Sequence, residues 1–205
     1  MKGSYMRKYQ KADTRKADIL ESYYQVMIKE GLEGSSIGKI AKHLDIHPSL
    51  IIHYFKNKEN MTYELVELLT QKYEARHMID LGDVTDPKER YALLMDIIFS
   101  YKWSRTVEPS VHFGFYYLSF RNQKINRRFK TMFKWLRDFL AIELTAYDEA
   151  GVIQVSDPVS AADYIVTVME GMEFQTQFLG DHQKFDQFAS LAKKTLKRAL
   201  ENGDF

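Results

Sequence analysis

The stretch that decides the fold is SSIGKIAKHLDIHPSLIIHYFKNKE, residues 35–59. Four apolar residues in it recur at helical spacing and predict a helix of about two turns: Ile37, Ile40, Ala41 and Leu44. Ser36 is placed to cap this helix. The pattern breaks at Asp45, a residue type that tolerates the left-handed backbone of a tight turn. A second helix is predicted after the turn, with His47 as a weak cap and Pro48 at its first position.

Two short helices joined in this way present one face inward and one face outward. Ile46, Ile51 and Phe55 are predicted to pack against the first helix. The outward positions are then His47, Ser49, Leu50, His53 and Tyr54. A helix this short fits the DNA major groove, which is roughly 12 Å wide. Spacing alone is equally compatible with a plain helical corner inside a larger bundle.

A family resemblance extends over residues 14–66. An apolar first helix contains Ile19, Leu20, Tyr23, Tyr24, Met27 and Ile28. The motifs that follow are Glu-Gly-Leu at 30–32, Ser-Ser-Ile at 35–37, Ile-Ala at 40–41, and His-Tyr-Phe with Lys-Asn-Lys-Glu-Asn-Met at 53–61. This arrangement resembles the N-terminal domain of TetR-type (TetR/AcrR) transcriptional regulators. The resemblance implies a three-helix head whose second and third helices form a helix-turn-helix.

The outward positions and the resemblance together predict contacts with a double-stranded DNA operator. The residue that corresponds to Lys58 usually meets a phosphate in this family. The predicted DNA-binding residues are Lys16, Ser36, Lys39, His47, Pro48, Ser49, Leu50, His53, Tyr54 and Lys58. Three positions depart from the family pattern: Asp45 replaces a usual glycine, His47 a usual serine or threonine, and Ile52 a common tyrosine. Leu50 and Ile52 have side chains suited to thymine methyl groups, although core packing explains Ile52 equally well.

Length and composition favour a helical regulator with two parts. The chain has 205 residues and no cysteine, which excludes disulfides, thiolate metal sites and cysteine nucleophiles. Residues 1–60 hold eleven Lys or Arg and seven Asp or Glu, which leaves 18 and 21 for residues 61–205. The basic end is therefore the predicted DNA end. No export leader or membrane-spanning apolar run is recognisable, so we expect a cytoplasmic protein with no membrane partner.

Helix signals continue through the remaining chain, and no alternating strand pattern of useful length occurs. Predicted helices run from Asn57 to about Ile79, from Asp86 to about Trp103, over residues 122–149, from Asp157 to about Leu179, and over residues 183–201, with a turn or short helix at Glu108 and Pro109. The predicted fold is all-α. Its predicted parts are a basic flexible arm (1–13), a helix-turn-helix head (14–60) and a helical ligand-binding and dimerisation body (61–205).

The carboxyl-terminal half resembles the body of many TetR-type proteins in the run Glu-Ala-Gly-Val-Ile at 149–153, Asp-Pro at 157–158, Ala-Ala at 161–162 and Glu-Gly-Met at 170–172. In that family the last two helices pair with those of a second subunit. The resemblance therefore implies a homodimer. Its predicted interface residues are Tyr164, Val168, Met172, Phe185, Phe188, Ala192 and Leu196, for which core packing within one subunit is the alternative.

Aromatic residues are concentrated in the middle of the chain and indicate a ligand cavity, with a merely large core as the alternative. Glu170, Glu173 and Gln177 are polar residues within an apolar helix, and a buried carboxylate needs a partner. A cationic or hydroxylated ligand in a cavity would supply that partner, and aromatic faces also favour a cation. The alternatives are solvent or a bond to Arg105, His112 or Arg121. The predicted ligand is a small hydrophobic or aromatic-stacking molecule. The predicted ligand-binding residues are His112, Phe113, Tyr116, Tyr117, Phe120, Trp135, Glu170, Glu173, Phe174 and Gln177.

The sequence carries none of three common catalytic motifs: it has no glycine-rich phosphate loop, no His-Glu-x-x-His and no nucleophile elbow. The histidines share no metal-ligand spacing, so neither a metal nor a cofactor is expected. The leading hypothesis is a transcription repressor that a small molecule releases from its operator. The alternative is a DNA-bound interaction protein of the same fold that recruits a protein partner. The operator, the ligand and the regulated genes are not specified by the sequence.

Overall fold

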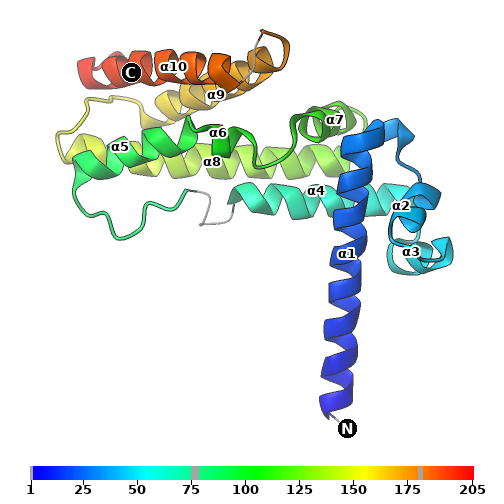
Figure 1. The fold of residues 1–205 in the computed structure, drawn as a ribbon. Coiled ribbons are helices and arrows are strands. Elements are labelled where there is room, and N and C mark those ends of the chain that lie inside the picture. The colour runs from blue at the N-terminus through cyan, green and yellow to red at the C-terminus, as the bar shows by residue number, and fades with distance from the viewer. Residues whose placement is uncertain (1, 75–78, 180–181) are drawn as a thin grey trace. The chain divides into compact units, whose positions relative to one another are not determined.

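The computed structural model describes residues 2–74, 79–179 and 182–205, with side chains from Thr14 onward. These residues form ten α-helices, and no β-strand occurs in the ranges described (Figure 1). The predicted all-α fold is therefore confirmed. Contacts divide the chain into two compact units, residues 1–70 with 107–128 and residues 71–106 with 129–205. We call them the head and the body, and each is described separately.

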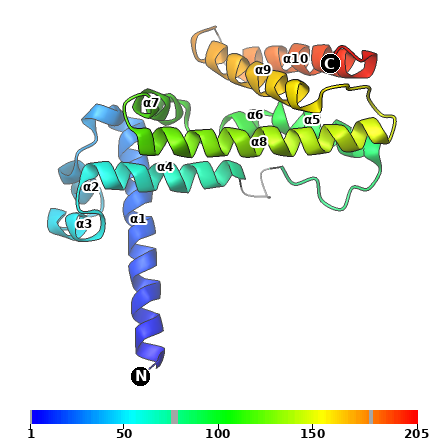
Figure 2. The same cartoon turned by 180° about the vertical axis from the view of Figure 1, so that it is seen from behind.

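The head contains the first four helices and one helix from the middle of the chain. Their bounds are α1 Lys2–Gly34, α2 Ile37–His43, α3 Pro48–Phe55, α4 Lys58–Glu74 and α7 Pro109–Ser119. Figures 1 and 2 show α7, in green, beside the carboxyl-terminal end of α1. The last residues of α4 and most of α8 belong to the body.

Helix α1 begins at Lys2, where the sequence analysis predicts a flexible arm over residues 1–13. A helix here is consistent with local propensity, because residues 2–13 contain no proline and a single glycine among good helix formers such as Met, Arg, Lys and Ala. At the other end, Gly31 has a positive φ of 74° and interrupts the helical geometry. Glycine adopts this conformation at little cost, so the chain turns here toward α2.

The core of the head is built from α1, α2, α3, α4 and α7. Buried apolar residues include Ile19, Tyr23, Met27, Ile40, Ile51, Phe55, Leu65, Val111 and Phe115. The Tyr23 hydroxyl is satisfied by Thr62 Oγ1 at 2.7 Å. This bond joins α1 to α4 inside the core, where an unpaired hydroxyl would be costly.

The body contains α5 Pro87–Ile98, α6 Tyr101–Ser104, most of α8 Gln123–Glu149, α9 Pro158–Leu179 and α10 His182–Asn202. Helix α5 is capped by Asp86, whose side chain accepts from the Glu89 amide at 2.9 Å. The helix predicted from Asp86 to Trp103 is broken, because Ser100 starts a new helix by accepting from the Trp103 amide. Both views show α9 and α10 side by side (Figures 1 and 2).

One apolar core fills the body, and a polar cluster lies at its edge. Arg90 donates two hydrogen bonds to Glu143, at 2.9 and 2.7 Å, and Tyr147 donates a third at 2.6 Å. Burial alone would raise the pKa of Glu143, but these bonds hold it below its usual value. The cluster thus keeps a buried carboxylate ionised between α5 and α8.

The division between the units differs from the predicted boundary at residues 60 and 61. Residues 61–70 of α4 and residues 107–128 pack with the head, because the apolar faces of α4 and α7 are part of its core. The sequence predicts that α4 ends near Ile79. Helix α4 is described as far as Glu74, and residues 75–78 lie outside the described residues. No helix in the described part of the chain is long and apolar enough to cross a membrane.

Candidate DNA-binding surface and the helical body

Helices α2 and α3 form the predicted helix-turn-helix. The Ser36 side chain accepts from the Lys39 amide at 3.2 Å and caps α2. Asp45 occupies the left-handed region with φ of 51°, as its position in the turn predicts. The Ile46 amide donates to the Ala41 carbonyl at 3.0 Å and closes the turn. A glycine is therefore not required at position 45.

Helix α3 exposes the face that the sequence predicts. His47 is the cap and its Nδ1 accepts from the Ser49 amide at 3.3 Å. Ile51 and Phe55 are buried and hold α3 against the rest of the head. The predicted contact residues His47, Pro48, Ser49 and His53 are exposed, whereas Leu50 and Tyr54 are partly exposed.

Ile52 points away from the core, since 47% of its surface is exposed. The core-packing interpretation of this residue is therefore wrong. Because Ile52 lies on the same short helix as the exposed Ser49 and His53, it adds an apolar side chain to this surface. The remaining interpretation, contact with a thymine methyl group, stays a prediction.

The lysines predicted to meet DNA also have partners within the head. Lys16 forms an ion pair with Glu64 at 2.5 Å, and Lys39 forms one with Glu30 at 2.8 Å. The Lys58 ammonium donates to the Leu32 carbonyl oxygen at 3.0 Å. Burial lowers the pKa of Lys58, an effect that Glu33 opposes. These three cations are thus positioned by the head itself before any phosphate is present.

Sequence reasoning missed a strained turn between α3 and α4. Lys56 has φ of 67° and ψ of −49°, and the Asn57 amide donates to the Phe55 carbonyl oxygen at 2.8 Å. This is a γ-turn of the rare form, which strains a residue with a side chain. The turn leaves Lys56 exposed, directly after α3. Lysine carries no local signal for positive φ, so the pattern could not reveal it.

The predicted ligand-binding residues fall into two groups that the structure does not bring together in one unit. His112, Phe113, Tyr116, Tyr117 and Phe120 lie on or just after α7 in the head. The other group lies on α8 and α9 of the body: Trp135, Glu170, Glu173, Phe174 and Gln177.

In the head group, the His112 ring contacts the ring of Tyr116 with centroids 4.5 Å apart and that of Phe113 at 5.7 Å. Burial lowers the pKa of His112 to about 4. Phe120, by contrast, is 85% exposed. The aromatic residues of α7 are therefore divided between the surface of the head and a packed cluster around His112.

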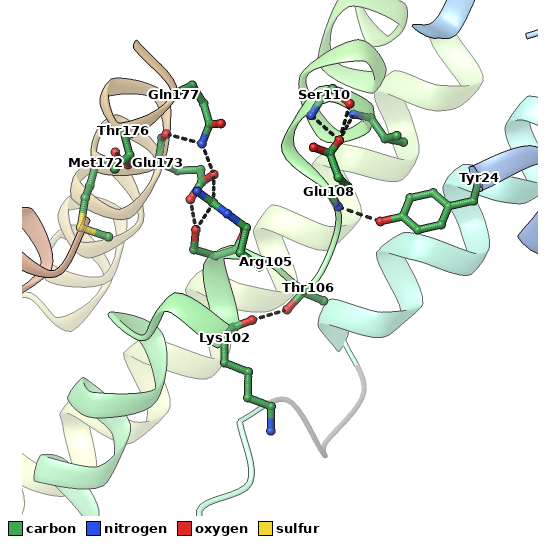
Figure 3. A network of polar contacts seen from close by, with 12 residues as sticks. Tyr24, Lys102, Arg105, Thr106, Glu108, Ser110, Met172, Glu173, Thr176 and Gln177 are labelled. Carbon is green, nitrogen blue, oxygen red and sulfur yellow. Dashed lines mark hydrogen bonds and ion pairs between the residues drawn. The ribbon is translucent and has the colours of Figure 1, made fainter. Parts of the chain in front are cut away.

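In the body group, Glu173 has an internal partner. Arg105 Nη1 donates to Glu173 Oε1 at 2.8 Å, and Gln177 Nε2 donates to the same oxygen at 2.8 Å (Figure 3). The Ser104 hydroxyl donates to Glu173 Oε2. The sequence offered three side chains as partners for this glutamate, and the structure shows that Arg105 is bonded to Glu173.

The other members of this group differ in exposure. Trp135 stacks on Phe139 with centroids 5.9 Å apart and is partly buried, as is Glu170. Phe174 is 53% exposed and contacts Phe178, so it lies on the surface of the described body.

The start of α7 is fixed to α1 within the head. The Glu108 amide donates to the Tyr24 hydroxyl at 2.7 Å, and the Glu108 carboxylate accepts from the Ser110 amide at 2.8 Å (Figure 3). Glu108 therefore caps α7 with its side chain while its backbone is held by α1. Tyr24 was predicted only as an apolar residue of the first helix.

A groove of about 330 Å³ runs between α9 and α10 on the body. Six of the seven predicted interface residues line it: Tyr164, Val168, Met172, Phe188, Ala192 and Leu196. Leu191, which was not predicted, also lines it and is 64% exposed. Phe185 is fully buried, so its assignment to the interface is corrected to the core of a single body. Leu196 is also buried, although it lines the floor of the groove. Leu191 was missed because it lies outside the apolar spacing considered.

Comparisons with known proteins agree with this architecture. Residues 19–65 match the family model for bacterial regulatory proteins of the tetR family, and residues 86–201 match the model for the tetracyclin repressor-like C-terminal domain. The fatty acid metabolism regulator protein of Bacillus subtilis is 29% identical over 82 residues, or 40% of this chain. The chain spans 42% of the length of that curated relative.

Two solved structures share the fold. A TetR transcription regulator from Haloarcula marismortui superposes with a TM-score of 0.81 at 16% identity, covering 92% of this chain and 98% of that one. A protein described as a transcriptional regulator from Saccharomonospora viridis, in complex with choline, gives 0.79 at 19% identity, covering 90% and 96%. With the helix-turn-helix head, the helical body and both family models in agreement, the chain belongs to the TetR family of DNA-binding transcriptional regulators.

Proposed function

We propose that the protein is a repressor that binds an operator through α2 and α3 and is released by a small molecule bound in the helical body. The exposed face of α3 carries this proposal. Ser49, Ile52 and His53 offer a hydroxyl, an apolar group and an imidazole on one short helix whose opposite face is fixed by Ile51 and Phe55. Such a face suits the base edges of the major groove.

We propose that the working form is a homodimer that pairs α9 and α10 of two copies. The groove and the exposed Tyr164 and Leu191 support this proposal, because they leave apolar area uncovered on one face of the body. One helix-turn-helix makes few base contacts, whereas two heads at a separation of about 34 to 36 Å read successive major grooves. Because this function requires access to an operator, we propose that the protein works in the cytoplasm.

The ligand-responsive part of the proposal rests on the body. A structural neighbour of this chain holds choline, which supports a small-molecule ligand here as well. A ligand shifts the population of a two-state protein only if it binds the two states with different affinity. We propose that the ligand favours the state whose heads do not fit the operator. No catalytic step is part of this function.

The test begins with selection of bound fragments from random duplex DNA by the full chain. The binding of the selected duplex is then compared for the wild type, Ile52→Ala and a matched exposed apolar substitution in the body, Ile142→Ala. We expect Ile52→Ala to relax preference at one base position, with a loss of about 1 kcal/mol at the preferred site. Enrichment of no sequence, or equal effects of both substitutions, would overturn the proposal.

A further inference from the structure

The Arg105 guanidinium occupies a small polar and aromatic site in the body. Its carbon Cζ lies 4.7 Å from the ring centroid of Tyr101 and 6.0 Å from that of Phe185. Its Nη1 donates to Glu173 and to the Ser104 hydroxyl. One cation is therefore surrounded by two aromatic rings from α6 and α10 and by a carboxylate from α9.

The carboxylate in this site is held in place by neighbours other than Arg105. Gln177 Nε2 donates to Glu173 Oε1 (Figure 3). The Ser104 hydroxyl donates to Glu173 Oε2. The Glu173 side chain is 13% exposed. An anion with this little exposure needs a cation beside it, whatever molecule supplies that cation.

The aromatic rings add a preference for the kind of cation. A cation within about 6 Å of an aromatic centroid is attracted by the ring face, and combinations of rings recognise guanidinium and quaternary ammonium groups. Phe185 is fully buried in the structure with Arg105 beside it. If Arg105 leaves, another weakly hydrated organic cation is suited to take its place against the ring.

Arg105 itself is held less firmly than the site. Its side chain is 26% exposed, and its bond to Glu173 runs through Nη1 instead of the two-nitrogen fork that makes Arg–carboxylate pairs strongest. Arg105 is also the C-cap residue that follows the four-residue helix α6. Its side chain can therefore turn toward solvent without disturbing a longer helix.

We propose that Glu173, Tyr101 and Phe185 form a binding site for a diffusible organic cation, a guanidinium or quaternary ammonium compound, which Arg105 fills in the unliganded protein. This inference rests on the proposed ligand-responsive function and names the chemical class of its ligand. Arg105 is a tethered competitor, so the incoming cation binds only the fraction of molecules in which Arg105 has turned away.

Displacement of Arg105 has a direct route to the head. Only Thr106 and Val107 separate Arg105 from Glu108, whose amide is bonded to Tyr24 of α1. Three residue steps span at most about 11 Å when extended. Arg105 fastens the body end of this link to α9, and Tyr24 fastens its head end to α1. A cation that releases Arg105 therefore removes one of the contacts that hold the body end of this short covalent connection, while the backbone bond from the Arg105 amide to the Tyr101 carbonyl oxygen remains.

The test measures cation binding to the full chain by calorimetry in the absence of DNA. The probes are ethylguanidinium and tetramethylammonium, with N-ethylurea as the neutral analogue of the first. Arg105→Ala removes the competitor and leaves room for the probe, so we expect it to bind ethylguanidinium at least about tenfold more tightly than the wild type. Glu173→Gln should abolish binding, and Tyr101→Leu should weaken it about tenfold.

A matched control is Lys193→Ala, which removes the cation of a different ion pair, with Asp96 at 2.7 Å, and should bind the probes as the wild type does. Arg105→Lys provides a second variant with a competing charge if Arg105→Ala does not fold. It should bind ethylguanidinium more tightly than wild type, because a strongly hydrated ammonium stacks less well than a guanidinium on the rings of Tyr101 and Phe185.

The proposal fails if Arg105→Ala and Arg105→Lys bind neither probe more tightly than the wild type. It also fails if N-ethylurea binds as well as ethylguanidinium or if Glu173→Gln retains binding. Because no DNA is present, these outcomes are independent of whether an operator is found. A repressor that recognises DNA but fails this test keeps its proposed function with a different ligand.

Discussion

The Lys58 ammonium and the Leu32 carbonyl oxygen lie 3.0 Å apart, so the first residue of α4 is tied to the last turn before α2. Leu32 follows Gly31, where the helical geometry of α1 is interrupted. An ammonium has three donors, and one of them is used here. The contact orients the side chain at a helix N-terminus, where backbone N–H groups also favour a phosphate.

Replacing this lysine should therefore affect both stability and DNA binding. For Lys58→Met we expect about 1 kcal/mol lower free energy of unfolding, measured in urea, because the bond to Leu32 is lost. Affinity for all duplexes should fall to a similar extent, and the salt slope of log K should decrease by about one. Lys194→Met, an exposed lysine of α10, should change neither quantity.

The γ-turn at Lys56 predicts a substitution that stabilises the head. Glycine has no Cβ and adopts positive φ without strain, so Lys56→Gly should raise the free energy of unfolding by about 1 kcal/mol. Lys56→Ala retains the strain and serves as the control with the same loss of charge. Equal stabilities of the two variants in urea titrations would contradict the assignment of strain to this turn.

The partly buried His112, whose pKa is lowered by desolvation, predicts a dependence of stability on pH. Because its folded-state pKa of about 4 is below the ordinary value of 6.5, the unfolded chain binds a proton that the folded protein does not. This contribution to stability is complete above pH 6.5 and is lost as the pH falls toward 4. We expect the effect to be about 2 kcal/mol between pH 7.5 and 4.5. Urea titrations at both pH values measure it.

The pH effect has a specific control. His112→Gln carries no titrating group and should lose less stability than the wild type over the same interval. His53→Gln, at an exposed position on α3, should retain the wild-type difference between the two pH values. A wild-type pH dependence in His112→Gln would assign the effect to other groups.

The groove between α9 and α10 predicts the effect of a charge on self-association. Leu191→Glu places a carboxylate on an exposed apolar position that lines the groove, so a dimer formed there should dissociate at micromolar concentrations. Light scattering coupled to gel filtration gives the mass. Ile142→Glu is the matched control, since Ile142 is 69% exposed on α8 and does not line the groove. Its mass should be that of the wild type.

The features predicted well from sequence are those set by nearby residues. Ser36 and Asp86 cap their helices by accepting from an amide three residues later, and Asp45 forms the turn that its chemistry allows. Such interactions involve few residues and a limited set of geometries. These local interactions explain why the positions of the helices and the exposed face of α3 were predicted from sequence.

The sequence pattern did not predict the features that depend on residues far apart in the chain. The bond between Glu173 and Arg105 joins residues 68 positions apart, so spacing offered it only as one of several choices. Periodicity marked Phe185 as apolar but could not tell an interface from the core, because both bury the same stripe. The packing of α7 within the head was not predicted either, because an apolar stripe does not show which helix it packs against.

That association has a consequence for how the protein is made. The chain leaves the ribosome amino end first, yet α1 packs with residues 107–128, which follow the body segment 71–106. A nascent chain of 70 residues still lacks Val111 and Phe115, two buried side chains of the head. The head is therefore completed only after α7 has emerged, and a newly synthesised chain can bind DNA only from that point of its synthesis on.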